Sequence, residues 1–423
     1  MKNKVQPAFR QLTVMFLMTV FQLICMADVL NLKKGDEIII IYTFLAFIAL
    51  EWLYMMFGTI IAKNDYFELE TIGFFLSGIG LTVCASFSKE FAEKQAVSIV
   101  LGLITYIFIL FVSKDAKIAG ALRYPAAVFS LIILTANLML AKATNGALNW
   151  IKIGSFSIQP SEIVKITFIF VGAVSLDKLL SSASLTKYII FSITCIGCLF
   201  VMKDFGTALI FFFTFILIAF MRSGDIRTII LICTVALMGA ALIIYFKPYV
   251  AKRFSAFRHV WEMSDTLGYQ QTRVMIYSAS GGLFGLGIGN GRLRNIFAAS
   301  TDLVFGLICE ELGLIVDIAV LLSFVFIAVF AVRNAKNSCS TFHAIASVAS
   351  AGLLLFQLSL NVFGVTDLLP LTGVTMPFVS RGGSSMICSW GLIAFIKAAG
   401  QPFVPPKPDI SMSKKRTSKK VIK

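Results

Sequence analysis

The chain has 423 residues, of which 58% are hydrophobic and only 14% are charged. Soluble domains carry about 25% charged residues, so this composition excludes an ordinary soluble protein. The net charge of +15 lies partly in a basic tail and otherwise in loops. It suits an anionic membrane surface and is no signal for nucleic acid. With two histidines, a histidine-built metal site is excluded, and the eight cysteines are interpreted as apolar packing residues.

Repeated apolar runs, each about as long as a bilayer is thick, predict about twelve transmembrane helices. Their approximate limits are 10–30, 38–62, 71–88, 96–113, 122–142, 161–178, 187–202, 205–221, 226–247, 302–332, 343–365 and 383–400. A sharp turn at Lys203-Asp204 separates the seventh and eighth spans. The expected fold is therefore an all-α polytopic membrane protein with a large extracytoplasmic loop at about 248–301.

Basic residues in the short loops predict the orientation, because they are enriched on the cytoplasmic side. The richer side holds Lys63, Lys114, Lys117, Arg123, Lys178, Lys187, Arg222, Arg227, Arg333, Lys336 and the tail. Both termini are therefore expected in the cytoplasm. The polar loops 143–160, 248–301 and 366–382 are then expected on the outer side.

The central loop is basic and rich in glycine. Its cations, among them Arg253, Arg258 and Arg273, indicate either recognition of a phosphate-bearing ligand or only solubility and lipid contact. Before Thr301 it offers two carboxylates, Glu262 and Asp265. The glycines are no nucleotide motif, since no strand precedes them and no GK[ST] follows. They predict a tight turn or flexible backbone near a ligand.

Charged residues also lie within or next to the predicted spans. Pro160 suits the first turn of a helix, which places Glu162 and Lys165 three apart on one face. They form either a self-neutralising pair or a buried pair that faces a cavity. The loop 366–382 is typical of a re-entrant or cavity-lining segment. Further polar residues, which are either functional or contacts between helices, are Glu51, Asp317 and Asn361.

Five motifs occur in one order: NGALNWIKIGSFSIQPSEIVK, KDFGTALIFF, SASGGLFGLGIGNG, STDLVFGLICEELGLI and LPLTGVTMPFVSRGGSS. With these motifs the chain resembles the shape, elongation, division and sporulation family of the RodA/FtsW/SpoVE type, from about Gly146 to Gln401. The resemblance implies a multi-pass enzyme of the bacterial cytoplasmic membrane. It would polymerise peptidoglycan glycan strands from lipid II at the outer face, beside a class B penicillin-binding protein and membrane lipids.

The resemblance also implies a set of site residues. It assigns the essential carboxylate to Asp265, as general base, with cations holding the leaving pyrophosphate. The implied substrate-binding residues are Gln159, Ser161, Glu162, Lys165, Asp204, Arg253, Arg258, Arg273, Asp302, Arg381 and Ser384. No cofactor is firmly implied; a divalent cation (Mg²⁺ or Mn²⁺) that bridges the pyrophosphate stays open.

The chain departs from the family pattern at Asn149, Lys203, Ser300 and Arg381, where a basic residue, a proline, a histidine and a tyrosine are usual. The family usually has ten spans, so residues 1–65 are interpreted as an additional pair of helices. A glycosyltransferase core is then expected at 66–403, and a basic cytoplasmic tail at 404–423. The role of the added helices stays open.

Three other functions are compatible with parts of this pattern. A flippase or transporter for a lipid-linked precursor would use intramembrane carboxylates such as Glu162, but the motifs gather on one side and no internal repeat is evident. A non-catalytic scaffold for a penicillin-binding protein would not need Asp265. A transferase of the O-antigen ligase type shares the general plan but not these motifs.

Overall fold

The computed structural model describes residues 2–33, 35–62, 67–114, 116–141, 149–153, 156–177, 182–227, 230, 232–234, 255–338 and 340–401. The helices are α1 (Lys2–Leu32), α2 (Glu37–Ala62), α3 (Glu68–Phe87), α4 (Lys89–Lys114), α5 (Ala116–Leu140), α6 (Pro160–Asp177), α7 (Ser182–Val201), α8 (Phe205–Ser223), α11 (Tyr269–Gly281), η1 (Leu293–Asn295), α12 (Val304–Glu311), α13 (Leu314–Asn337), α14 (Thr341–Val365) and α15 (Gly383–Ala399). Strands β1 (Ile151–Ile153) and β2 (Phe156–Ile158) form a small antiparallel pair before α6.

Eight of the described helices are long and apolar enough to cross a membrane, namely α1 to α5, α8, α13 and α14. The apolar stretches Thr186–Val201 of α7 and Gly383–Ala399 of α15 are shorter, and α6 carries the charges of Glu162, Lys165 and Asp177. The predicted span 226–247 lies mostly outside the described residues. The all-α membrane fold is thus confirmed, and the count of about twelve spans stays a prediction.

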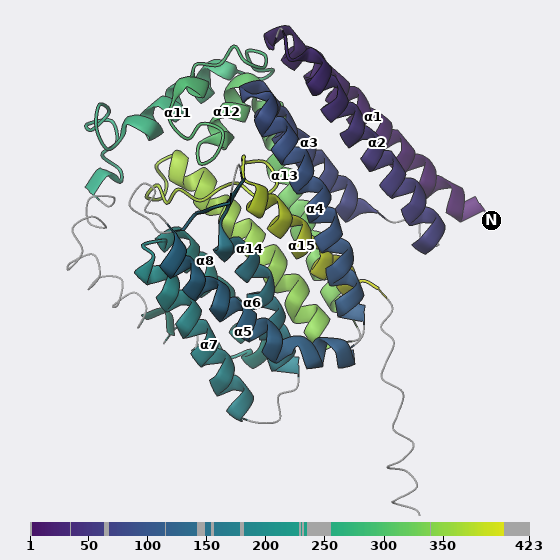
Figure 1. Cartoon of the computed structure of the whole chain (residues 1–423), viewed down its shortest axis with the longest axis vertical. Helices are drawn as coiled ribbons and strands as arrows, with labels where there is room; N and C mark the ends of the chain where they lie inside the picture. The colour runs from purple at the N-terminus through teal and green to yellow at the C-terminus, as the bar shows by residue number, and fades with distance from the viewer. Residues whose placement is uncertain are drawn as a thin grey trace, which may run out of the picture.

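Helix α15 lies at the centre of the bundle and packs against α4, α14, α13 and α6 (Figure 1). Its Trp390 is fully buried, and its ring is 5.0 Å from that of Phe74 and 5.9 Å from that of Tyr106. The indole leaves no room for a side chain on α4, because a Cβ at Gly102 would lie 2.7 Å from Trp390 Cδ1. This close approach brings α3, α4 and α15 together.

Helices α1 and α2 lie together on one flank of the bundle (Figure 1). A buried hydrogen bond joins them, from Gln22 Nε2 to Glu51 Oε2 at 2.9 Å. Aromatic rings attach the pair to α3, with Phe47 and Phe74 centroids 6.1 Å apart. Glu51 is therefore a contact between helices, which is one of the two roles expected for it.

The predicted span 302–332 is wrong in one respect, because a break divides it into α12 and α13. Gly313 lies at the break with φ +88°, a conformation that favours glycine. A Cβ there would lie 2.4 Å from Gly285 N. The backbone of the glycine-rich segment 281–291 therefore approaches this turn closely.

The glycine-rich segment also forms backbone hydrogen bonds with α12. Leu286 N donates to Glu310 O at 2.9 Å, and Gly287 N donates to Glu311 O at 3.0 Å. A Cβ at Gly281 would lie 2.1 Å from Cys309 O. Gly285, Gly287 and Gly289 have φ between +80° and +88°, so of the two expectations for these glycines the tight turn is confirmed.

The central position of Trp390 leads to a stability prediction. Trp390→Ala is expected to lower the free energy of unfolding by about 3–5 kcal/mol, because truncating a buried aromatic side chain leaves a cavity. Phe108→Ala is the control, since Phe108 is 61% exposed on α4. This substitution should change the free energy of unfolding by less than about 0.5 kcal/mol. Unfolding in detergent, followed by circular dichroism, measures both. Equal losses in the two variants would contradict the central role of Trp390.

Candidate functional site

The motifs of the sequence converge where α6, α8 and α15 begin. Gln159, directly before α6, donates its backbone N–H to Ser384 Oγ at 3.2 Å and its side-chain amide to Asp204 Oδ2 at 3.1 Å. Ser384 lies in the first turn of α15, and Asp204 is the N-cap of α8. Because the N-terminus of a helix carries partial positive charge, the junction of the three helix starts favours negative charge, which the Asp204 carboxylate supplies at the start of α8.

Asp204 holds this junction together through both carboxylate oxygens. Oδ1 accepts the backbone N–H of Thr207 at 3.2 Å, which caps α8. Oδ2 accepts the side-chain amides of Gln159 at 3.1 Å and Asn149 at 3.2 Å. Asn149, where the resemblance implies a basic residue, thus donates to Asp204. The predicted turn is confirmed by Lys203, which has φ +61°.

A second polar cluster is buried inside the bundle. Lys165 Nζ lies 2.6 Å from Glu162 Oε1 and 2.8 Å from Gln357 Oε1. Lys165 is 1% exposed and Glu162 4%, so the pair is buried, while the cavity expected beside it stays a prediction. The cluster continues into the loop 366–382, because Gln357 Nε2 donates to Thr375 O at 2.8 Å and Thr375 Oγ1 donates to Ser385 Oγ at 3.3 Å.

The loop 366–382 has no regular secondary structure, yet residues 374–380 are all buried. Asn361 Nδ2, on α14, donates to Val374 O at 2.7 Å and to Asp302 O at 2.8 Å. Ser380 Oγ donates to Thr301 O at 2.6 Å. The segment before α12 and the loop 366–382 therefore form one hydrogen-bonded unit. This burial fits the expected re-entrant character of the loop.

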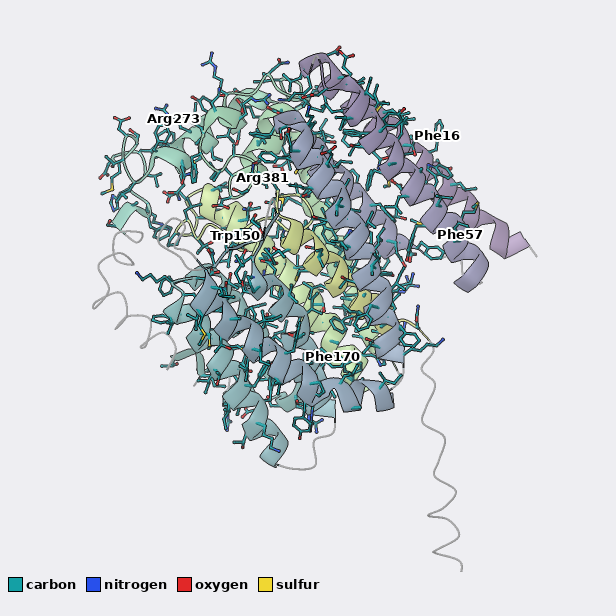
Figure 2. The ribbon with its side chains drawn as sticks, in the orientation of Figure 1. Phe16, Phe57, Trp150, Phe170, Arg273 and Arg381 are labelled. Atoms are coloured by element: carbon teal, nitrogen blue, oxygen red, sulfur yellow. The ribbon has the colours of Figure 1, made fainter. Side chains whose placement is uncertain are left out.

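The predicted cations occupy different places around this unit. Arg381 stacks over Phe91, with its Cζ 4.1 Å from the ring centroid, and its backbone N donates to Ser300 O. In Figure 2, Arg381 and Trp150 lie near the upper end of the bundle and Arg273 lies in the layer above. Arg273 stacks on Tyr269 of its own helix at 5.1 Å. Arg253 lies outside the described residues.

Asp265 is exposed in the segment 255–268, which leads into α11. Two contacts hold this region against α14 and the loop 366–382. The backbone N of Arg258 donates to Asp367 Oδ1 at 3.1 Å, and Gln271 Nε2 donates to Gly364 O at 2.8 Å. Within the described residues no hydrogen bond or ion pair joins the Asp265 carboxylate to the Glu162–Lys165 pair. The two groups are linked through the shared loop.

Two residues of this arrangement were missed by the sequence analysis. Gln357 is the second acceptor for Lys165, and Asp367 holds the segment that carries Asp265. A signal for Gln357 was present, because a glutamine in the middle of an apolar span needs an internal partner. For Asp367 the loop sequence alone offered no signal.

Comparisons with known proteins agree with the motifs. A family model described as "Cell cycle protein", for FtsW, RodA and SpoVE, matches residues 69–401. A protein of Buchnera aphidicola, named probable peptidoglycan glycosyltransferase FtsW, is 30% identical over 79% of this chain and 90% of its own length. The peptidoglycan glycosyltransferase RodA of Mycobacterium leprae is 28% identical over 72% of this chain and 69% of its own length.

Solved structures show the same fold. A chain from a peptidoglycan synthase complex, in a study of polymerization and crosslinking, superposes with a TM-score of 0.65 and 22% identity, over 78% of this chain and 96% of that one. The crystal structure of Thermus thermophilus RodA superposes with a TM-score of 0.59 and 22% identity, over 78% and 95%. With the family model covering most of its length, this chain belongs to the FtsW/RodA/SpoVE family of cell cycle proteins.

Proposed function

We propose that this chain is a peptidoglycan glycosyltransferase that polymerises lipid II at the outer face of the bacterial cytoplasmic membrane. The observation that carries the proposal is the convergence of three helix starts, at Pro160, Phe205 and Gly383, on the segment with Asp302 and the loop 366–382. Such a junction attracts a diphosphate. The relatives named peptidoglycan glycosyltransferase support the same activity.

The proposed reaction transfers a glycan chain from its lipid carrier to a sugar hydroxyl. The hydroxyl oxygen of one lipid II forms a bond to the anomeric carbon of the lipid-linked chain. The bond from that carbon to the diphosphate breaks, and polyprenyl pyrophosphate leaves with the electron pair. Asp265 accepts the hydroxyl proton. A base opposite the leaving group would invert the anomeric centre.

Positive charge around the junction would stabilise the leaving pyrophosphate. Arg381 and Arg258 flank the loop 366–382, and we assign them to the phosphate oxygens. Gln159, Ser161, Asp204, Asp302 and Ser384 are assigned to the walls of the substrate site. The ammonium of Lys165 is buried against two acceptors. We therefore propose that Lys165 holds Gln357 in position, and through Gln357 the backbone of Thr375. Arg253 and Arg273 remain further candidates.

A divalent cation between the phosphates remains part of the proposal. In the part of the chain that the structure describes, no group of three or more His, Cys, Asp or Glu side chains is placed to hold a metal ion. Such an ion would therefore take phosphate oxygens as ligands, and its role would be to neutralise their charge.

We also propose a class B penicillin-binding protein as partner, with both termini in the cytoplasm. The support for the partner is the structural match to a chain of a synthase complex in which polymerization and crosslinking are coordinated. The support for the orientation is the excess of basic residues in the loops on one side. The end of the bundle where α6, α8 and α15 begin, which we call the motif end, then faces the outer leaflet.

The catalytic assignment predicts the effect of one substitution. Asp265→Asn is expected to lower the rate of lipid II polymerisation by about 10²–10⁴-fold, because the amide cannot take the hydroxyl proton. The control is Glu262→Gln, which removes an exposed carboxylate three residues away and should retain activity. Glycan strands made from labelled lipid II, with and without the penicillin-binding protein, are the measurement. An active Asp265→Asn variant would remove this residue from the mechanism and favour the scaffold alternative.

The buried pair leads to a second prediction, which separates stability from activity. Lys165→Met alone should lower the free energy of unfolding by about 3–5 kcal/mol, because it leaves the Glu162 carboxylate buried without its partner. The double variant Glu162→Gln/Lys165→Met should recover most of that stability. Its polymerisation rate should stay low, since Gln357 loses its charged donor. Thermal unfolding and strand formation are measured on the same preparations.

Recovery of both quantities in the double variant would contradict the positioning role. It would show that the pair is only a self-neutralising contact at the start of α6, which is the other interpretation of its spacing.

A further inference from the structure

A cavity of about 260 Å³ lies between α5, α6 and α7. Apolar side chains form most of its wall, including Leu131, Val171 and Phe191. Ser175 of α6 also lines it, 13 residues beyond Glu162, so the cavity lies roughly 20 Å along the helix from the buried pair. Figure 2 shows the neighbouring Phe170 far below Trp150 and Arg381. The cavity is therefore separate from the candidate site and lies toward the opposite membrane face.

Two cations lie at this cavity. The guanidinium of Arg123 stacks on Tyr124, with Cζ 4.3 Å from the ring centroid, and it donates to the Tyr124 hydroxyl. The ammonium of Lys187 lies 5.5 Å from the same centroid. Within the described residues neither cation forms an ion pair. Two positive charges thus gather around one neutral ring, which favours an anion there.

Away from the two cations the wall of the cavity is apolar. Tyr188 lines the cavity and is 1% exposed, and its ring packs against Phe168 and Phe215. A wall that is apolar on one side and cationic at one end matches a molecule with a chain and a charged head.

We propose that this cavity binds an anionic phospholipid of the inner leaflet. Its phosphate lies between Arg123 and Lys187, and an acyl chain lies along Leu131, Val171 and Phe191. The basic loops predict that this end of the bundle faces the cytoplasm, where the leaflet carries the anionic lipids that basic pockets between helices bind. The proposal does not depend on the glycosyltransferase activity, because it concerns the other face of the bundle.

The test is native mass spectrometry of the full-length protein in detergent, titrated with phosphatidylglycerol. Wild type should bind it, and Arg123→Gln/Lys187→Gln should bind roughly 30-fold more weakly, since each cation near a membrane surface contributes about one factor of five. The matched control is Arg333→Gln/Lys336→Gln, which removes two exposed cations from the last turns of α13 and should change binding by less than about threefold. Ser175→Leu keeps both cations but fills the cavity, and it should also weaken binding.

Three results would overturn the proposal. One is an equal loss in the two double variants, which would mean general charge attraction. Another is equal binding of zwitterionic phosphatidylcholine by wild type. The third is full competition by inorganic phosphate, which would mean a simple anion site without a chain. The melting temperature of each variant is recorded on the same preparation, and if Arg123→Gln/Lys187→Gln melts below wild type, its two single forms are measured in its place.

Discussion

A buried ion pair in a membrane-embedded bundle must find its remaining hydrogen-bond partners inside the protein, and this constraint organises the candidate site. Lys165 neutralises Glu162 one turn earlier and also donates to Gln357 on α14. Gln357 in turn holds the backbone of the loop 366–382 at Thr375. Lipid offers no substitute for these partners. The loop can therefore be irregular and buried, because Gln357 and Asn361 of α14 donate to its backbone carbonyls.

The same loop connects the other parts of the site. Asn361 joins it to the segment of Asp302, and Asp367 joins it to the segment that carries Asp265. Three helices begin at this end of the bundle, so partial positive charge accumulates there without any further side chain. The exposed Asp265 carboxylate and the helix starts are thus connected through one loop, and the proposed reaction would use the carboxylate for deprotonation and the helix starts for charge neutralisation.

The two ends of the bundle differ in chemistry. At the motif end, polar groups of the loops and helix starts bind one another closely. At the opposite end, α5, α6 and α7 leave an apolar cavity with two cations. The flanking pair α1–α2 precedes the region of the family model, and aromatic contacts to α3 and an ion pair between Asp36 and Lys89 attach it to the bundle. The proposed reaction, the proposed lipid contact and the packing of α1–α2 would therefore use separate surfaces of one fold.

Apolar run lengths were sufficient to predict the membrane class, the turn at Lys203 and the start of α6 at Pro160, because hydrophobic periodicity and proline geometry act locally. The Glu162–Lys165 pair was predictable for the same reason, since its spacing lies within one turn. The break at Gly313 was not, because it depends on the glycine-rich segment 281–291, which is distant in sequence and approaches it closely. Nor was the partnership of Lys165 with Gln357, 192 residues away. Such contacts depend on how helices that are distant in sequence pack together, so no local sequence pattern predicts them.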